Sequence, residues 1–108
     1  MRQMMLGAML AACATGPALA QTAGVGGDPQ KGSELARTWC GGCHVVEARP
    51  AAANDQAPGF LAIAQRPGTT ADGLRAFLSV PHGRMPNLTL SRQDIDNTVA
   101  YLLSLKGR

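Results

Sequence analysis

The chain has 108 residues, a length typical of one domain, and a formal net charge of +3. Aromatic residues make up only 4% of it, and its basic residues form no continuous run. Because nucleic-acid binding needs a cluster of positive charge or an aromatic stacking platform, nucleic acid is not an expected partner. No apolar segment reaches the roughly 20 residues that a transmembrane helix needs, so a membrane span is not expected either.

Residues 1–20 carry the three parts of a secretory signal peptide. Arg2 gives a positively charged start, an apolar run covers residues 4–14, and residues 18–20 (A-L-A) match the A-x-A cleavage pattern. We therefore expect a bacterial protein that is exported to the periplasm, cleaved after residue 20, and left with a flexible leader over residues 21–27.

Cys13 offers an alternative processing route, because residues 10–13 (L-A-A-C) resemble the site at which bacterial lipoproteins are cut and acylated on cysteine. In that case a lipid at Cys13 would anchor the chain to a membrane. We favour simple export, because the charged start, the apolar run and the A-L-A site form a complete export signal. The remaining chain is expected to fold as one domain over residues 28–108.

A first helix is expected from residue 28 up to the first cysteine of the mature chain. Asp28 is a favourable N-cap, and Pro29 suits the first helical position. Gly32 and Ala36 are small residues one turn apart, so a second helix could approach this one closely.

The central motif of the chain is C-G-G-C-H at residues 40–44, which matches the C-x-x-C-H pattern of covalent haem attachment. Each thiol can add to one vinyl group of a porphyrin, and His44 then lies where its imidazole can bind the iron. Two thiols in an oxidising compartment are expected to pair or to be consumed, and thioether formation consumes both. A small domain with few large apolar residues also needs additional core, which a porphyrin would supply. We therefore predict one covalently bound haem c, attached through Cys40 and Cys43.

Two other kinds of site share part of this motif. A zinc site would need Cys40, Cys43, His44 and His82 together, but the adjacent Cys43 and His44 can rarely bind one ion. A thiol–disulfide site of the thioredoxin kind is suggested by Trp39 before the first cysteine. That fold, however, needs an apolar strand leading into the motif, and here a capped helix leads into it. Both alternatives are less favoured than haem.

The middle of the chain is expected to contain a loop and two helices. Residues 45–59 are rich in proline and turn formers and are expected to form a loop, followed by a short helical piece at residues 60–64. Thr69 with Asp72 three residues later is a start typical of a capping box. Apolar residues at helical spacing then predict about ten helical residues from Thr70.

An irregular segment over residues 81–90 contains the only methionine of the mature chain, Met85. A haem iron that transfers electrons needs a ligand on its second face as well as on the first. Met85 stands before Pro86, which stiffens the backbone, so we predict His44 and Met85 as the axial ligands, with His82 as the rival to Met85. Met/His ligation raises the reduction potential relative to two histidines and leaves no open position for a substrate, which favours electron transfer over catalysis.

The last helix has the strongest boundary signals in the sequence. Ser91 is the expected N-cap and Asp94 completes a capping box. Apolar residues at helical spacing form one stripe between Ile95 and the end of the helix. Lys106 is expected in the last turn, with Gly107 just past the end.

From about Gly27 to Lys106 the chain resembles the small bacterial class I cytochromes c. The matching features are Gly32, the C-G-G-C-H motif, Pro58, Met85-Pro86 and Ala100-Tyr101-Leu102. The resemblance implies an all-α cytochrome c fold, with three to four helices packed around one covalently bound haem.

The resemblance also implies roles for single residues. The carbonyl of Pro58 would accept a hydrogen bond from Nδ1–H of His44 and so orient the axial ligand from outside its coordination shell. Gly32 would face Tyr101 where the first and last helices cross, with Tyr101 as an ordinary core aromatic. His44 and Met85 would bind the iron.

The expected function is that of a monohaem cytochrome c, an electron carrier and not an enzyme. Its partners would be redox proteins, namely a dehydrogenase as donor and an oxidase or reductase as acceptor. One alternative is a dedicated haem c subunit that accepts electrons from one periplasmic dehydrogenase. A less favoured alternative is a haem sensor or enzyme with a labile sixth ligand.

Overall fold

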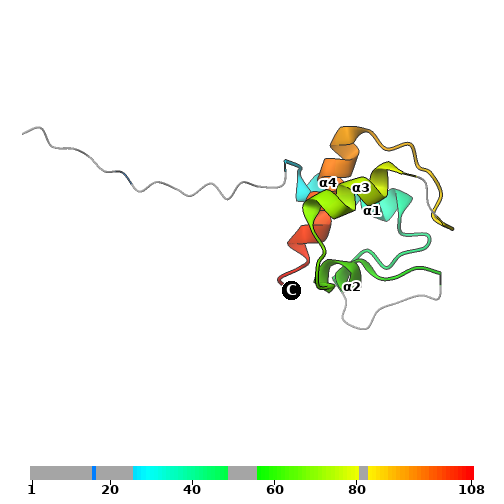
Figure 1. Ribbon diagram of the computed structural model, residues 1–108, viewed down its shortest axis with the longest axis horizontal. Coiled ribbons are helices and arrows are strands. Elements are labelled where there is room, and N and C mark those ends of the chain that lie inside the picture. Colours follow the sequence, from blue (N-terminus) through cyan, green and yellow to red (C-terminus); the bar gives the residue numbers. More distant parts are fainter. Residues whose placement is uncertain (1–15, 17–25, 49–55, 81–82) are drawn as a thin grey trace, which may run out of the picture.

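The computed structural model describes residues 16, 26–48, 56–80 and 83–108. Four helices, and no strand, lie in these ranges: α1 (Pro29–Trp39), α2 (Phe60–Gln65), α3 (Ala71–Ser79) and α4 (Arg92–Ser104). The last helix, α4, contacts the other three and crosses α1 most extensively (Figure 1). The predicted all-α class is confirmed. No helix among the described residues is long and apolar enough to cross a membrane.

The helices α1 and α4 begin where their capping residues predict. The Asp28 carboxylate accepts hydrogen bonds from the backbone N–H groups of the first turn of α1, which starts at Pro29. Ser91 and Asp94 form the complete capping box of α4, in which each side chain bonds the other residue's backbone N–H. Because each cap satisfies N–H groups that the helix itself leaves unpaired, such a cap typically contributes about 1 kcal/mol to stability.

The start of α3 differs from the prediction by one residue. Its N-cap is Thr70, whose hydroxyl accepts a hydrogen bond from the Gly73 backbone N–H at 3.1 Å. Thr69 is engaged elsewhere, because its hydroxyl donates to the carbonyl of Ile63 at 2.8 Å. A threonine that closes the preceding turn cannot also cap the next helix, and the sequence pattern does not distinguish these two uses of adjacent threonines.

The predicted end of α4 is also wrong. The helix ends at Ser104 with Leu105 as its C-cap, so Lys106 lies beyond the last turn. The Lys106 ammonium group donates instead to the backbone carbonyl of Thr69 at 3.2 Å, which ties the chain terminus to the segment between α2 and α3.

The crossing of α1 and α4 depends on Gly32. A Cβ atom at this position would lie 2.5 Å from the carbonyl carbon of Asn97, closer still to its oxygen, and 2.9 Å from Cβ of Tyr101. The two backbones are therefore nearly in contact, as the small residue predicts. Gly27, the last residue of the predicted leader, also lies against the backbone of α4, because a Cβ there would meet the carbonyl group of Asp96.

Buried Asn97 ties the start of α1 to α4. Its side-chain oxygen accepts a hydrogen bond from the Asp28 backbone N–H and another from the side-chain amide of Gln93, both at 2.9 Å. A buried amide oxygen is costly unless it is hydrogen-bonded. The bond from Asp28 joins the start of α1 to α4, and the bond from Gln93 lies within α4 and holds the Asn97 side chain in place. No sequence signal indicated this role for Asn97.

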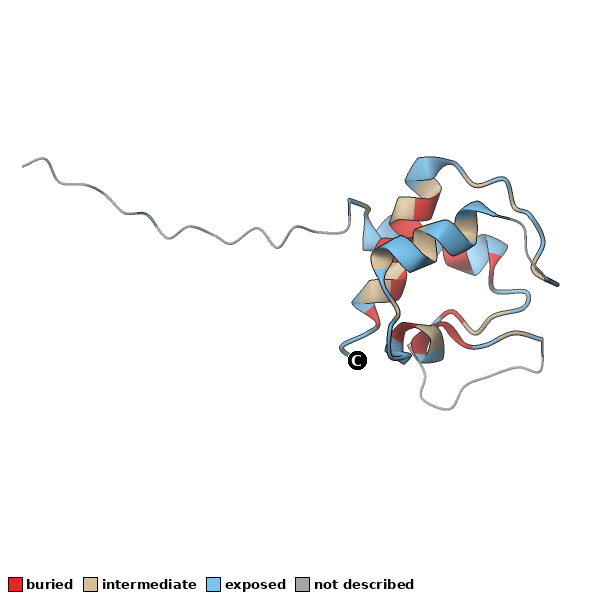
Figure 2. Cartoon of the chain, in the orientation of Figure 1, coloured by how far each residue is buried: buried red, intermediate tan, exposed pale blue. Residues whose placement is uncertain are grey.

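The four helices differ greatly in how much they bury. Figure 2 shows buried residues along α4 and none on α3. The core consists mainly of apolar side chains from α1, α2 and α4 and includes Ala36, Phe60, Ala64, Val99, Leu102 and Leu105. The amphipathic helix α3 therefore has no fully buried residue, and its inner face, with Leu74 packed against the core, is only partly buried.

Candidate functional site

The C-G-G-C-H motif continues directly from the end of α1 as a tight turn. The backbone N–H of Cys40 donates to the carbonyl of Ala36 at 2.8 Å. The N–H groups of Cys43 and His44 both donate to the carbonyl of Cys40, at 3.1 and 2.9 Å. Gly41 is required for this turn, because a Cβ there would lie 2.8 Å from the carbonyl oxygen of Arg37. Both cysteines and the histidine are therefore held within one turn of backbone.

The two thiols of the motif differ in exposure. Cys40 is 7% exposed, and burial raises the pKa of its thiol, whereas Cys43 is exposed. Neither is in a disulfide. Two unpaired thiols on one turn match the requirement for two thioether bonds to one porphyrin.

His44 is oriented by a hydrogen bond to the segment before α2. Its Nδ1 atom lies 2.6 Å from the carbonyl oxygen of Pro58. A carbonyl oxygen can only accept, so Nδ1 carries the proton, and the lone pair of Nε2 remains available for a metal ion. This is the contact that the resemblance implied between His44 and Pro58. A hydrogen bond of this kind fixes the ring and makes the imidazole a better ligand.

Two further contacts hold the backbone just after His44. The backbone N–H of Phe60 donates to the carbonyl of Val45 at 2.9 Å, and the hydroxyl of Tyr101 donates to the carbonyl of Val46 at 2.5 Å. Sequence reasoning assigned Tyr101 only to the helix crossing. Because Tyr101 and Val46 are far apart in the chain, no local pattern could have indicated their hydrogen bond.

Met85 lies on a separate segment of the chain, after α3. It is partly buried and lines a cavity of about 20 Å³ with Phe77 and Leu78 of α3 and with Leu88. The structure therefore brings together Cys40, Cys43, His44 and Pro58, and it places Met85 beside the apolar residues of α3. The rival ligand His82 lies outside the described residues.

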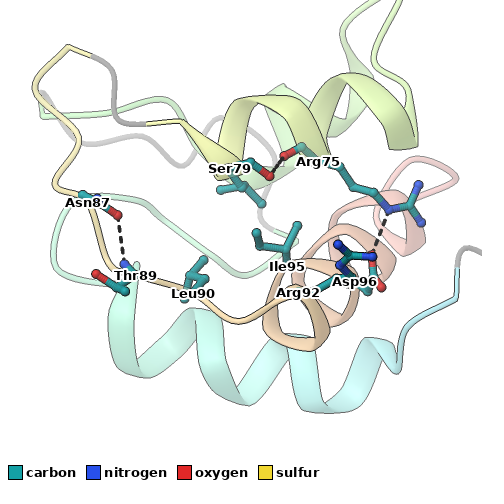
Figure 3. Close-up of a pocket in the computed structure, with 9 residues that line it drawn as sticks. Arg75, Ser79, Asn87, Thr89, Leu90, Arg92, Ile95 and Asp96 are labelled. Carbon is teal, nitrogen blue, oxygen red and sulfur yellow. Dashed lines mark hydrogen bonds and ion pairs between the residues drawn. The ribbon is translucent and has the colours of Figure 1, made fainter.

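A second cavity, about 800 Å³, is not lined by any of the predicted site residues. It lies between α3, the first turns of α4 and the segment from Asn87 to Leu90, with Ile95 pointing into it (Figure 3). Arg75 of α3 donates to the carboxylate of Asp96 at 2.8 Å and to that of Asp72 at 3.3 Å. The bond to Asp96, more than any other contact, raises the pKa of Arg75. This ion pair ties α3 to α4 at the edge of the cavity.

The residues of the site fit a covalently bound haem. The motif offers two unpaired thiols and an imidazole with an available Nε2. Apolar side chains are exposed near the end of α3, where Phe77 is 51% and Val80 is 59% exposed. A porphyrin held at the motif would cover apolar surface that the protein leaves in contact with water, and such burial is favourable.

The described residues do not support the two alternative sites. No group of three or more histidine, cysteine, aspartate or glutamate side chains in these ranges could hold a metal ion. The zinc hypothesis also required His82, which is not among them. A helix, α1, leads into the motif, and none of the described segments is the strand that a thioredoxin-like site requires.

The segment that carries Met85 contains a strained residue, Thr89, with a φ of 52°. A β-branched residue is a rare occupant of this left-handed region, whereas asparagine adopts it more readily. Replacing Thr89 by asparagine is expected to raise the free energy of unfolding by roughly 1 kcal/mol. Chemical denaturation measures the change in the free energy of unfolding. Thr38→Asn is the control, because Thr38 is an exposed residue of α1 with ordinary helical geometry, so its replacement relieves no strain. Equal unfolding midpoints for wild type and Thr89→Asn would contradict the expectation.

The comparisons with known proteins agree with this geometry. The family model described as cytochrome c matches residues 29–106. The chain is also 39% identical over 79 residues to cytochrome c-552 of Bradyrhizobium diazoefficiens, a match that covers 73% of this chain and 76% of that protein. The comparison with solved structures gives no significant match. From the extent of the family match and of the relative, we conclude that this chain belongs to the cytochrome c family, as a small class I member with covalently bound haem c as its cofactor.

Proposed function

We propose that the protein is a periplasmic monohaem cytochrome that passes single electrons between redox proteins, with the iron bound by His44 and Met85. The coarser part follows from family membership, because cytochromes c are haem c electron carriers. The observation that supports His44 as a ligand is the hydrogen bond from its Nδ1 atom to Pro58. It leaves Nε2 available as an axial ligand on the turn that holds both cysteines.

Each residue of the site has a distinct task in this proposal. Cys40 and Cys43 hold the porphyrin by thioether bonds, and Pro58 keeps His44 in the orientation and protonation state that a ligand needs. Met85 would hold the iron through its soft thioether sulfur, a ligand that favours Fe(II). With His44 and Met85 as its ligands, the iron would have no open position for a substrate, and the haem would supply one-electron redox chemistry.

The proposed partners are a dehydrogenase that donates electrons and an oxidase or reductase that accepts them. Trp39 is well exposed and immediately precedes Cys40, so its indole ring lies beside the attachment site. An exposed aromatic ring near the cofactor provides apolar contact for such a partner. A dedicated subunit of one dehydrogenase could use the same Trp39 contact in a longer-lived complex. No observation on the described residues favours that alternative over a carrier.

Periplasmic location is proposed from the sequence of residues 1–20, which apart from Gly16 lie outside the described residues. Export fits the two thiols of the mature chain, because thiols in an oxidising compartment are expected to pair or to be consumed, and thioether formation consumes both. Cleavage after Ala20 is the preferred processing, with lipid attachment at Cys13 as the alternative.

The decisive experiment is expression of the full chain in a bacterium that has a haem-attachment system. The intact mass of the purified protein is expected to equal residues 21–108 plus one haem, and the reduced visible spectrum is expected to be that of a six-coordinate c-type haem. The variant Cys13→Ser is expected to give the same mass and spectrum. A mass that starts at a diacylated Cys13 would overturn the proposed processing, and a haem-free product would overturn the proposed function.

A further inference from the structure

We propose that Tyr101 of α4 is a positioning residue for the axial histidine: its hydroxyl holds the backbone after His44, and its ring supports the Phe60 ring that packs against the imidazole. This inference rests on the proposed function, in which His44 binds the haem iron. Tyr101, near the end of the chain, would thus restrict the His44 ring in addition to the hydrogen bond from His44 to Pro58.

The hydrogen bond to Pro58 by itself leaves one motion of the imidazole open. It fixes the position of Nδ1, with 2.6 Å between that atom and the carbonyl oxygen. A single bond of this kind does not prevent the ring plane from tilting about the line between the two atoms. Another contact must therefore restrict the plane of the His44 ring.

Phe60 provides that contact. Its ring centroid lies 5.2 Å from that of His44, with the planes inclined by 60°. Phe60 is itself almost fully buried, and the backbone hydrogen bond from its N–H to the carbonyl of Val45 fixes it beside the histidine. An aromatic ring in this position resists tilting of the imidazole by direct packing.

Tyr101 supports both Phe60 and the backbone that carries His44. Its ring centroid lies 6.3 Å from that of Phe60, with the planes inclined by 47°. Its hydroxyl donates to the carbonyl of Val46 at 2.5 Å, a short bond in a partly buried environment. Tyr101 therefore acts on the histidine through the packed ring and through the chain two residues away.

Tyr101 is itself held firmly, because it lies where α1 and α4 pack most closely. A Cβ atom on Gly32 would lie 2.9 Å from Cβ of Tyr101, so Tyr101 belongs to the closest part of the α1–α4 crossing. The turn that holds His44 continues from the other end of α1. The chain before His44 is therefore held by α1, and the chain after it is held by Tyr101 of α4. Because α1 and α4 pack against each other, the imidazole is fixed relative to the two cysteines.

The test compares the holoprotein with its Tyr101→Phe variant, which removes the hydroxyl and keeps the ring. Exchange of the His44 Nδ1 proton with solvent is expected to accelerate about fivefold, the factor that corresponds to losing one ordinary hydrogen bond. The haem methyl proton resonances of the oxidised protein are expected to shift, because they report the orientation of the axial imidazole. Phe60→Leu, which keeps apolar volume but removes the ring, is expected to shift the same resonances without loss of the hydroxyl bond.

Ser104→Ala is the matched control. It removes another hydroxyl of α4, one that donates to the carbonyl of Tyr101 at 2.6 Å on the exposed side of the helix. This variant is expected to leave the His44 proton exchange and the haem methyl shifts unchanged. If Tyr101→Phe lowers stability but leaves both signals as in wild type, Tyr101 has only a packing role and the inference is wrong. Failure of the proposed function would instead be seen in the wild type, as absence of haem or of a histidine signal at the iron.

Discussion

Replacing Met85 by alanine is expected to leave the haem attached while it opens the sixth coordination position of the iron. In the proposed site, attachment depends on Cys40 and Cys43, which lie on a different segment from Met85. Loss of the soft thioether removes the preference for Fe(II), so the reduction potential is expected to fall by on the order of 0.1 V. Redox titration measures the potential, and binding of carbon monoxide to the reduced protein at neutral pH reports the open position.

Leu88→Ala is the control for this experiment. Leu88 is on the same segment, is likewise partly buried and lines the same small cavity as Met85. Its truncation removes a comparable apolar group without a sulfur atom, so the spectrum is expected to remain that of a closed site and carbon monoxide binding to remain weak. If Met85→Ala keeps the wild-type spectrum and potential, Met85 is not the ligand, and His82 becomes the residue to test.

Replacing Gly32 by alanine is expected to lower the free energy of unfolding by about 3 kcal/mol, at the upper end of the range for overpacking. Inside an isolated helix the same change would be stabilising by roughly 0.5–1 kcal/mol. Here the added methyl group would collide with the carbonyl of Asn97 and with Cβ of Tyr101. Neither atom can rotate away, because one is backbone and the other is attached directly to it, so the two helices would have to separate.

Gly107→Ala is the matched control, because an added Cβ at that position meets no atom within 4 Å and the residue lies outside the attachment motif. It is expected to unfold at nearly the same denaturant concentration as wild type. Guanidinium unfolding of the holoproteins, followed by helical circular dichroism, measures both variants. Equal midpoints for Gly32→Ala and Gly107→Ala would show that the α1–α4 crossing is looser than the structure indicates.

The parts of the fold that the sequence predicts correctly are those with a local physical cause. Asp28 and Ser91 cap their helices because each side chain reaches a backbone N–H two or three residues away. Gly32 predicts a close helix crossing because only the absence of a side chain permits one. The attachment motif is readable for the same reason, since its two thiols and imidazole must lie on one turn.

The features that could not be predicted depend on residues far apart in the chain. Asn97 bonds to the backbone of Asp28, and Tyr101 bonds to the backbone of Val46, across separations of 69 and 55 residues. The periodicity of apolar residues does not indicate such hydrogen bonds. In each of them one partner is a backbone group, which any residue type could supply. The smaller errors concern Thr69 and Lys106, whose side chains could either stabilise a helix end or bond to another segment. In the structure Thr69 bonds to the carbonyl of Ile63, and Lys106 bonds to the carbonyl of Thr69.

The absence of buried residues on α3 bears on how haem enters the protein. One thiol of the motif, that of Cys40, is covered in the folded chain, whereas haem attachment requires both thiols to reach a flat and rigid molecule. Displacing α3 would expose apolar side chains that are only partly buried, such as Leu74, and would break the partly buried ion pair between Arg75 and Asp96 of α4. We therefore expect haem attachment to begin on a chain in which α1 and α4 are already packed together and α3 is displaced. The packing of α3 against the haem would then be the last step of assembly.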